Sequence, residues 1–547
     1  MSIPKIRLYC DEDKNAIFNY FNRVFLENSR ILNLQGKDND LLDIKKAYCE
    51  HGEFWILAIG KQIIGTIALR RVKDFYEIRR FFILKKYKNL GYGQKMLFTL
   101  LKYAFINGIN CLKIATMNNG IEVNHIIQKY NFHPIKNYNN SSADLFWEVD
   151  LHYNKVYSLF CSRANYILEH SLILNPTENF PFYEEYNTNN FEDIYVSERY
   201  KSIEDIVIFG NRNELIDLYD ITKQIWRANL KAFDVDIKTM SGLNAHLIFF
   251  LCVAKPGDSI LLLPEIAGGH YSTENMLRKI GMDVLLFPVD MDNHCIDIEK
   301  SIQLIKDKSP KFIFIDRSEG INYEDFSWLK EFRQSIKVFD ASQYLSQIIT
   351  GYYPNPFEQG FDYILSSLHK NYPGPQKSII ATRQPTHIWS EFLVESKTFI
   401  SNTHPQNIFK SVIPLLNKSF LEKYANESIM LSNELYCELK QLGVPVIRRD
   451  ERFKPTPHIW IKPKTQRQAY ELFLKLEETG ISTNYRKLPY NLGFGLRLGV
   501  NGAIRQGLKM EHIQTLAKCI AEIYNSTTYN PKLYRKTVDF VQRIIAK

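Results

Sequence analysis

Short apolar runs alternate with helical or turn-rich segments between residues 259 and 365. The runs are Ser259–Leu263, Asp283–Pro288, Lys311–Asp316, Lys337–Asp340 and Tyr363–Leu365. Such alternation predicts a mainly parallel sheet that binds its ligands at the C-terminal ends of its strands. The chain is 547 residues long, more than one hydrophobic core usually supports, so two or three domains are expected.

The first 150 residues predict an α/β unit of their own. Strands are expected at Phe54–Ile59, Gln62–Leu69, Tyr76–Leu84, Cys111–Thr116 and Leu145–Val149, with a helix at Gln94–Asn107. We therefore predict a mixed sheet with helices at 1–150, a large domain at 151–400 and a smaller α+β domain at 401–547. In this last domain helical spacing dominates, and strands are expected near Val444–Ile447 and Leu496–Leu498.

Composition and charge narrow the classes of function. The 69 Lys and Arg against 60 Asp and Glu are spread along the chain, so no nucleic-acid partner is predicted. The longest apolar runs, such as Leu247–Ala254, are far shorter than the roughly 20 residues that cross a bilayer. Met1–Cys10 lacks the apolar core of a secretory signal, which predicts a cytoplasmic protein. The cysteines are scattered singly, so no metal site is predicted.

A reactive-looking lysine lies in Ser366–Gln376, which reads Ser-Ser-Leu-His-Lys-Asn-Tyr-Pro-Gly-Pro-Gln. Lysine condenses with an aldehyde only where its surroundings keep part of it neutral. Lys370, between an apolar run and a rigid turn, is thus a candidate attachment point for pyridoxal phosphate. The alternative is a lysine that stands near a turn by chance.

The other groups that a pyridoxal enzyme needs also have candidates. Asp340 ends an apolar strand and can stay ionised beside a pyridinium nitrogen, and Ser241-Gly242-Leu243 precedes an apolar segment whose free N–H groups could hold the phosphate. His270 follows two glycines that let the backbone approach a planar ligand. Arg497 offers a planar fork that matches a carboxylate. Each could also be an ordinary turn, core or surface residue, but together they favour a cofactor site.

From about residue 165 to 525 the chain resembles serine hydroxymethyltransferase, a family within the aspartate-aminotransferase-type fold. Leu174–Phe180 is similar to the early Ser-Glu-Asn segment of that family. The resemblance implies substrate-binding roles for Glu178, Tyr200, Asn484 and Arg497, catalytic roles for Lys370, His270 and Glu198, and cofactor contacts by Ser241, Gly242, Leu243, Ser318, Asp340, Gln343 and His369.

Several positions depart from the family pattern. Leu243 replaces a serine of the phosphate loop, Gln343 a histidine, Leu368 a threonine and Gln376 an arginine. The spacing of tyrosines around Glu198 also differs. Residues after Asn484, a position that resembles a folate contact, do not match, so the use of tetrahydrofolate is left open.

Lys85–Gln94 carries a basic turn and two glycines between a strand and a helix, a pattern that suits a pyrophosphate held by backbone N–H groups. The segment resembles the acetyl-CoA loop of the GNAT acetyltransferases, which implies acetyl-CoA contacts by Lys88, Gly91, Gly93 and the strand around Ile83. The usual general-acid tyrosine of that family is absent, because Tyr130 is not equivalent to it. Glu77 or a water could act as base, and a non-catalytic acetyl-CoA-binding module is the alternative.

The two resemblances imply a homodimeric enzyme with two activities on small amino acid substrates. One domain, with pyridoxal phosphate, would make or cleave serine, glycine or another β-hydroxy amino acid, and the other would acetylate an amine. Two alternatives stand beside this hypothesis: a folate-independent threonine-type transaldolase, and a degenerate pyridoxal scaffold with a binding or regulatory role.

Overall fold

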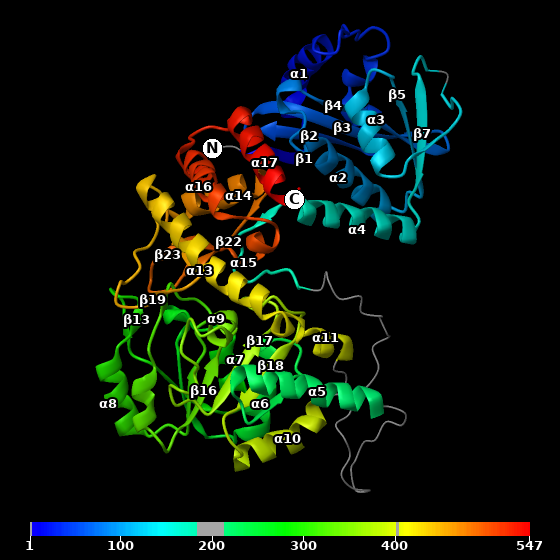
Figure 1. Cartoon of the computed structure of the whole chain (residues 1–547). Coiled ribbons are helices and arrows are strands. Elements are labelled where there is room, and N and C mark those ends of the chain that lie inside the picture. Colours follow the sequence, from blue (N-terminus) through cyan, green and yellow to red (C-terminus); the bar gives the residue numbers. More distant parts are fainter. Residues whose placement is uncertain (1–2, 140, 183–212, 401–403, 547) are drawn as a thin grey trace. The chain divides into compact units, whose positions relative to one another are not determined.

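The computed structural model describes residues 3–139, 141–182, 213–400 and 404–546. The chain divides into two compact units (Figure 1). The first unit contains the residues up to Ser171, together with Glu478–Gly480 and Asn525–Arg543. The second contains Leu172–Glu477, Ile481–Tyr524 and the residues from Ile544 onward. Within the described ranges, no helix is both long enough and apolar enough to span a bilayer.

The first unit is built on one mixed sheet with the strand order β1-β2-β3-β4-β5-β7-β6. Its strands are β1 (Lys5–Leu8), β2 (Glu53–Ile59), β3 (Gln62–Val72), β4 (Phe75–Ile83), β5 (Cys111–Thr116), β6 (His133–Pro134) and β7 (Leu145–Asp150). Neighbours pair antiparallel except β4 and β5, which are parallel. The mixed sheet predicted for residues 1–150 is thereby confirmed.

Helices bury apolar faces on this sheet. They are α1 (Lys14–Leu26), α2 (Tyr92–Ile106), α3 (Ile121–Lys129) and α4 (Tyr153–Glu169). The apolar spacing that predicts α2 is met in the core, where Met96, Leu97 and Leu100 are fully buried. The sequence pattern missed β1, α1 and α3. β1 is only four residues long and partly exposed, so it lacks a clear apolar alternation.

Part of the C-terminal segment also belongs to the first unit. It includes most of α17 (Pro531–Ile545). The Tyr529 ring stacks on Tyr87 with 5.9 Å between centroids, and its hydroxyl lies 2.8 Å from that of Tyr92. Arg535 donates a 2.9 Å hydrogen bond to the Lys88 carbonyl. The C-terminal segment therefore supports the turn between β4 and α2.

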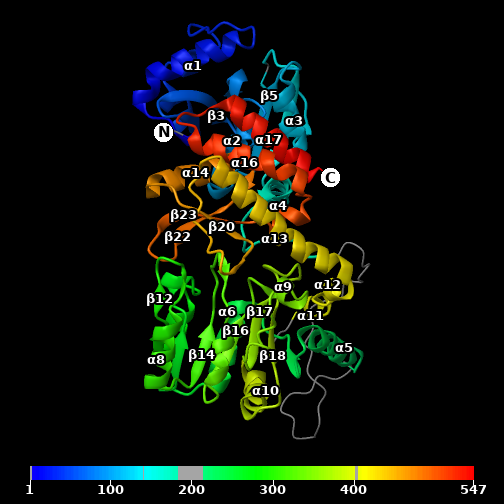
Figure 2. The ribbon, with the colours of Figure 1, turned by 60° about the vertical axis from the view of Figure 1, so that its left-hand side comes forward.

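The second unit contains a sheet with the order β11-β10-β14-β16-β17-β18-β9. Its strands are β9 (Asp234–Asp236), β10 (Ser259–Leu262), β11 (Asp283–Leu286), β14 (Phe312–Ile315), β16 (Ile336–Asp340), β17 (Tyr363–Ser367) and β18 (Ser378–Thr382). The strands from β11 to β17 are parallel, whereas β18 pairs antiparallel with both of its neighbours, β17 and β9. Figure 2 shows β14, β16, β17 and β18 side by side. The predicted mainly parallel sheet is confirmed.

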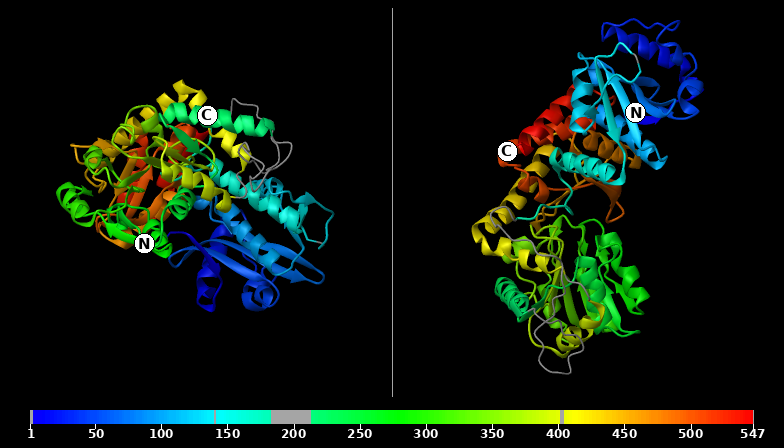
Figure 3. Two further views of the ribbon diagram at one scale, coloured as in Figure 1. Left: turned by 90° about the horizontal axis from the view of Figure 1, so that it is seen from below. Right: turned by 90° about the vertical axis from the view of Figure 1, so that its right-hand side faces the viewer.

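Helices cover both faces of this sheet, as the right-hand view of Figure 3 shows for its green strands. The helices of this part are α5 (Asn213–Leu230), α6 (Gly242–Val253), α7 (Thr273–Lys279), α8 (Ile298–Lys308), α9 (Leu345–Ile349) and α10 (His387–Phe399). On β14, Phe312 and Phe314 join the core formed with α6 and α10, while Ile313 and Ile315 join the core on the opposite face. A strand buried on both faces needs a continuous apolar run, which explains its sequence.

The C-terminal part of the second unit carries an antiparallel sheet, β20 (His458–Ile461), β23 (Gly493–Gly499) and β22 (Asn484–Leu488). The remaining helices are α11 (Pro405–Lys410), α12 (Ile413–Leu416), α13 (Lys418–Gln441), α14 (Gln466–Glu478), α15 (Asn501–Arg505) and α16 (Met510–Asn525). Two-stranded pairs complete the structure: β8 (Leu172–Ile173) with β21 (Ile481–Ser482), β12 (Val289–Asp290) with β13 (Cys295–Ile296), and β15 (Asn322–Tyr323) with β19 (Lys454–Pro455).

One predicted strand of this part is wrong. Val444–Ile447 forms only an isolated bridge between Val446 and Ile461. Pro445 has no N–H to donate to a ladder, and the Val446 N–H is turned back to the carbonyl of Val444 at 2.7 Å.

Candidate active sites

The C-terminal ends of β14, β16 and β17 meet at one edge of the larger sheet. Asp316 directly follows β14, Asp340 is the last residue of β16, and Lys370 comes shortly after β17. Parallel strands end on the same side of a sheet, so the topology gathers these groups from distant parts of the sequence. Asp316 and Asp340 are buried, and Lys370 is partly buried.

Asp340 is held by a histidine that sequence reasoning missed. The Nε2 atom of His246, on α6, lies 2.6 Å from Asp340 Oδ2, and the Ser342 N–H donates a 2.6 Å hydrogen bond to Asp340 Oδ1. Asp316 Oδ2 lies 3.8 Å from His246 Nδ1. The available signal was the position of His246, one helical turn after Gly242 and at the start of an apolar run in α6.

The charges of this cluster favour an ionised Asp340. Burial by itself would raise the pKa of Asp340, but the charge and hydrogen bond of His246, with the charge of Lys370, lower that pKa to about 2. Burial opposes the protonation of His246, yet Asp316 and Asp340 outweigh it and raise the pKa of His246. The three side chains are close enough to share a cation, but the imidazole–carboxylate contact already uses their ligand atoms.

The start of α6 forms a cradle for an anion. Ser241 caps the helix by accepting the Asn244 N–H at 3.3 Å. The other N–H groups of the first turn have no acceptor within the helix and can bind an anion. A Cβ at Gly242 would lie 3.1 Å from Ser342 Oγ, so glycine allows the helix to approach the ends of β16 and β17. The buried hydroxyl of Ser367 has no hydrogen-bond partner among the described residues. Leu243, 38% exposed, contributes only backbone.

Gly268 and Gly269 position His270. At Gly268, where φ is +88°, a Cβ would lie 1.9 Å from the Glu319 carbonyl oxygen, and at Gly269 it would lie 2.2 Å from that of Leu263. The glycines are therefore needed for close contact with the chain's own backbone, and not only for the approach of a ligand. The His270 ring lies 6.4 Å from that of His246, and its Nδ1 accepts the Ser272 N–H at 3.3 Å.

We expect the stability of the second unit to fall as the pH drops from about 6.5 to about 4. Burial first, and then the charges of His246 and Lys370, lower the pKa of His270 to about 4. The unfolded chain, with a histidine pKa of about 6.5, binds a proton in this window that the native state does not. Urea unfolding at several pH values should show the loss, and His270→Phe should reduce its slope while the exposed-site control His387→Phe leaves it unchanged. An imidazole resonance of His270 that titrates near pH 6.5 would contradict the expectation.

The backbone around Lys370 is fixed on both sides. Asn179 donates to the Lys370 carbonyl at 2.9 Å and to the Tyr424 hydroxyl at 2.8 Å. The side chain of Asn371 accepts the Ser346 N–H at 2.7 Å. A lysine on such a braced segment can present its amine in one direction, which a covalent attachment requires. His369 faces the same region, and burial with the charge of Lys370 lowers the pKa of His369 to about 4.

Arg497, predicted to bind a carboxylate, is buried and lies beside Ser318. Its Nη1 donates to the Ser318 carbonyl at 3.4 Å and lies 3.9 Å from Glu319 Oε1, while its Nε has no partner among the described residues. Arg486, which the sequence did not indicate, pairs with Glu319 at 2.5 Å and so draws that carboxylate away from Arg497. Asn484 stands opposite Arg497 in the β22–β23 register. The partly free guanidinium fork of Arg497 can receive a carboxylate.

Gln343, which replaces a family histidine, contacts a histidine from another strand. His458 on β20 places Nε2 3.1 Å from Gln343 Oε1, and both side chains are fully buried. Burial, followed by the charges of Arg497, Arg449 and Lys370, lowers the pKa of His458 far below its ordinary value. Sequence reasoning missed His458 because β20 is separated from the strand that carries Asp340 by more than a hundred residues.

The side chain of Glu178 is exposed. Glu198, Tyr195 and Tyr200 lie outside the described residues.

The residues of this edge fit pyridoxal phosphate. The unpartnered hydroxyl of Ser367 and the space kept by Gly242 suit a phosphate, and the buried Asp340 suits a ring nitrogen. Lys370 would provide the attachment, and His270 the flat surface over the ring. The fold and this set of residues are those expected of a pyridoxal phosphate-dependent enzyme.

The first unit contains a cavity of about 1640 Å³. Its lining includes Ile83, Lys88, Gly91 and Gly93, the four residues that the sequence assigned to acetyl-CoA. β4 pairs with β5 only from Tyr76 to Ile78, so the β5-facing edge of β4 beyond this point is open to the cavity. The backbone groups around Ile83 are therefore placed to meet a ligand.

The loop at the start of α2 supplies the other end of this cavity. Gly91 caps α2 with φ of +79°, a conformation that favours glycine, and the N–H groups of the first turn point out of the helix end. A Cβ at Gly93 would lie 3.0 Å from the Ile126 side chain. Lys88 lies 3.2 Å from Glu122. This arrangement suits the pyrophosphate of acetyl-CoA.

Tyr130 takes no part in the cavity lining. Its hydroxyl donates to Gln94 at 3.0 Å, its ring packs edge-on against Phe98, and burial raises its pKa. It is a core residue of the unit.

We expect Tyr529→Ala to weaken acetyl-CoA binding about fivefold. The substitution removes the ring that packs on Tyr87 and the hydroxyl that contacts Tyr92, and an aromatic pair of this kind contributes about 1 kcal/mol. Calorimetry with acetyl-CoA measures the change. Tyr529→Phe keeps the ring contact and should lose much less affinity. Equal affinity for Tyr529→Ala and the unmodified chain would contradict this role of the C-terminal segment.

Comparisons with known proteins agree with the two sites. Residues 183–417 match the family model described as serine hydroxymethyltransferase, and residues 19–132 match the acetyltransferase (GNAT) family. The serine hydroxymethyltransferase of Pyrobaculum calidifontis is 27% identical over 317 residues, which cover 56% of this chain and 74% of that protein. That of Sulfolobus acidocaldarius is 26% identical over 317 residues, covering 56% and 73%. A crystal structure of L-threonine transaldolase from Pseudomonas fluorescens shares the fold, with a TM-score of 0.63 at 21% identity over 71% of this chain and 91% of that one.

The chain combines a region similar to the GNAT acetyltransferases, residues 19–132, with a region similar to serine hydroxymethyltransferase, residues 183–417. It is therefore an enzyme with two transferase-type domains.

Proposed function

We propose that the larger domain makes or breaks the Cα–Cβ bond of a β-hydroxy amino acid, with glycine as the smaller partner, and that the GNAT domain acetylates an amine. The observation that carries the first part is the convergence of Lys370, Asp340 and His270 on one sheet edge, together with the buried fork of Arg497. Lys370 would attach the cofactor, Asp340 would pair with its ring nitrogen, and His270 would stack on its ring. Arg497 would bind the carboxylate of the substrate.

Each side chain has a role that follows from its surroundings. Arg497 binds the carboxylate of the amino acid, and Asn484, opposite it in the sheet, adds a polar contact. Asp340 stays ionised because His246 and the Ser342 N–H hold its oxygens. His270 stays neutral at pH 7, which suits a surface against a pyridine ring. Pyridoxal phosphate, when bound, supplies the electron sink for charge that develops at the α-carbon.

A folate-independent transaldol exchange is the second candidate for the same site. The fold is shared with an L-threonine transaldolase, and positions that the hydroxymethyltransferase family keeps polar are changed here, with Gln343 contacting His458 in place of the family histidine. Both candidates use the same bond and the same residues. They differ in whether tetrahydrofolate or a second aldehyde takes up the carbon fragment.

Product analysis separates these candidates. The purified chain is incubated with glycine and a panel of aldehydes, or with threonine and an acceptor aldehyde, with and without tetrahydrofolate, and the products are identified by mass spectrometry. A β-hydroxy amino acid formed without folate supports transaldol or aldol exchange, and serine formed only with methylenetetrahydrofolate supports hydroxymethyl transfer. Absence of any such product from a cofactor-loaded protein would support the degenerate scaffold and refute the proposal.

We also propose that the enzyme works as a homodimer in the cytoplasm. Family resemblance supports the dimer. Light scattering of the purified full chain tests the first, and cell fractionation the second.

A further inference from the structure

The acceptor end of the acetyltransferase cavity is marked by the separation of two strands. β4 and β5 hydrogen-bond from Tyr76 to Ile78, and Arg79 is the first residue beyond this pairing. Arg79 lines the cavity, as do Ile83 further along the same strand and Gly91 at the start of α2. A pantetheine arm that runs along β4 from the pyrophosphate loop would point its acetyl group toward Arg79.

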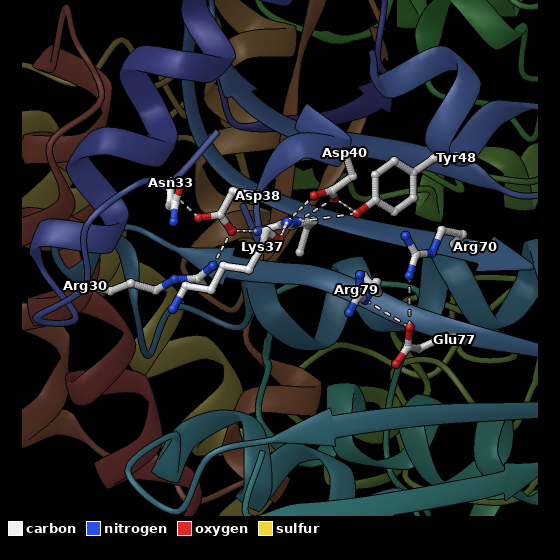
Figure 4. A network of polar contacts seen from close by, with 10 residues as sticks. Arg30, Asn33, Lys37, Asp38, Asp40, Tyr48, Arg70, Glu77 and Arg79 are labelled. Atoms are coloured by element: carbon white, nitrogen blue, oxygen red, sulfur yellow. Dashed lines mark hydrogen bonds and ion pairs between the residues drawn. The ribbon is translucent and has the colours of Figure 1, made fainter. Parts of the chain in front are cut away.

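Glu77, the acid next to this point, is not free to bind an amine. Its Oε1 accepts hydrogen bonds from the Tyr138 hydroxyl at 2.9 Å and the Asn139 amide at 2.7 Å. Its Oε2 lies 2.9 Å from Arg79 Nε and 3.6 Å from Arg70 Nη2 (Figure 4). The Glu77 side chain is only 3% exposed. Two hydrogen-bond donors and two arginines thus surround this buried carboxylate, which orients Arg79 and shields Glu77 from an incoming ammonium.

Arg79, in contrast, keeps its terminal nitrogens open. Its side chain is 31% exposed, and within the described ranges Glu77 is the one carboxylate with which it pairs, through Nε. The other arginines at this end of the cavity are paired: Arg30 with Asp38 (Figure 4), and Arg80 with Asp38 and Asp40. Lys37 also lines the cavity, but its ammonium lacks the planar fork of an arginine. A guanidinium fixed at Nε with its fork free matches a carboxylate in geometry and charge.

We propose that the acetyl acceptor is an amino acid whose carboxylate binds the fork of Arg79. This inference rests on the acetyl transfer proposed above and assigns its substrate class. The amine nitrogen of the acceptor forms a bond to the acetyl carbonyl carbon, the carbon–sulfur bond breaks, and the pair of electrons leaves with the sulfur of coenzyme A. The proton lost by the amine is taken up by solvent or by the leaving thiolate, so no oxidant or further reactant is needed.

The reaction proposed for the larger domain also has amino acids as substrates and products. An α-amino acid released there carries both the free amine and the carboxylate that the cavity would bind. The reaction class that supplies the acceptor is therefore amino acid aldol chemistry, and joining the domains would raise the local concentration of the acceptor.

Acceptor analogues that differ only in the carboxylate test this proposal. Acetyl transfer from acetyl-CoA to L-serine, L-serinamide and ethanolamine is followed by thiol release and by mass spectrometry of the N-acetyl product. We expect a KM for serine at least about tenfold below those of the two analogues, because a charge-assisted bidentate contact contributes about 1.5–3 kcal/mol. Equal KM values for serine and ethanolamine would overturn the proposal.

Variants test whether the preference for a carboxylate depends on Arg79. Arg79→Met should raise the KM for serine about 10- to 100-fold, leave ethanolamine unaffected and leave the Kd for acetyl-CoA unchanged. Arg79→Lys should recover part of the loss, since it keeps the charge without the fork. Arg71→Met, on the exposed end of neighbouring β3, is the matched control and should behave as the unmodified chain. Equal losses for serine and ethanolamine with Arg79→Met would contradict a carboxylate site at Arg79.

A binding measurement keeps the carboxylate site testable if acetyl transfer itself fails. Calorimetry compares N-acetyl-L-serine with N-acetylethanolamine in the presence of coenzyme A; neither ligand has a free amine for the larger domain. Binding of N-acetyl-L-serine alone, lost in Arg79→Met, supports the site even without turnover. No preference between the two ligands refutes it. Acetyl-CoA binding without transfer to any amine would refute only the proposed acetyl transfer.

Discussion

Replacing Lys370 by alanine should abolish the covalent attachment of pyridoxal phosphate and lower activity of the larger domain by at least about 10³-fold, within the range that one positioned proton-transferring group supplies. Lys370 is the amine on the braced segment that follows β17, where Asn179 holds its carbonyl. Borohydride trapping and mass spectrometry of the tryptic peptides measure the attachment. The visible spectrum of the loaded protein gives a second readout.

The control for this experiment is Lys397→Ala, which removes an exposed lysine of α10. It should keep both the trapped adduct and the activity. If Lys370→Ala retained a cofactor adduct on another lysine at full yield, the assignment of the attachment site would be wrong. Thermal unfolding of both variants without cofactor shows whether the substitution has disturbed the fold instead.

Gly268→Ala should destabilise the second unit by about 3–5 kcal/mol, the range of the most damaging single substitutions. The added Cβ would stand 1.9 Å from the Glu319 carbonyl oxygen, and φ at this position is +88°, which disfavours any side chain. The contact is with backbone, so no flexible side chain can move aside. The displacement would also carry His270 and Glu319 out of place, and cofactor affinity should fall with stability.

A second glycine separates steric contact from backbone strain. Gly351 has φ of +78°, but a Cβ there would meet nothing within 4 Å. Gly351→Ala should therefore cost only about 1–2 kcal/mol, the strain of a left-handed residue. Urea unfolding of both variants, monitored by tryptophan fluorescence, gives the comparison. Similar losses for the two variants would show that Gly268 is needed only for its backbone angle.

Hydrophobic periodicity along the chain is enough to predict five strands of each large sheet, but not β1 and β6 of the first or β9 and β18 of the second. The fully apolar run of β14 and the helical spacing of Met96, Leu97 and Leu100 depend on local burial alone, so they were predictable. Short or partly exposed elements such as β1 were missed. The apolar composition of Val444–Ile447 predicted a strand that does not form, because Pro445 has no N–H for the hydrogen bonds of a strand pair.

The site was predicted in part. Lys370, Asp340 and His270 stand beside glycines, prolines or apolar strands that mark them in the sequence. His246, His458 and Glu319 were not identified from the sequence. Their importance comes from partners on other strands: Asp340 for His246, Gln343 for His458, and Arg486 for Glu319.

The sequence by itself determined the two α/β folds and which residue types could perform pyridoxal and acetyl-CoA chemistry, because burial periodicity and glycine placement are local properties. Only the tertiary structure decided which charged side chains are paired and which remain open to a ligand. Whether a carboxylate is open or occupied depends on partners that lie far away in the sequence: Tyr138 and Asn139 donate to Glu77, and His246 contacts Asp340.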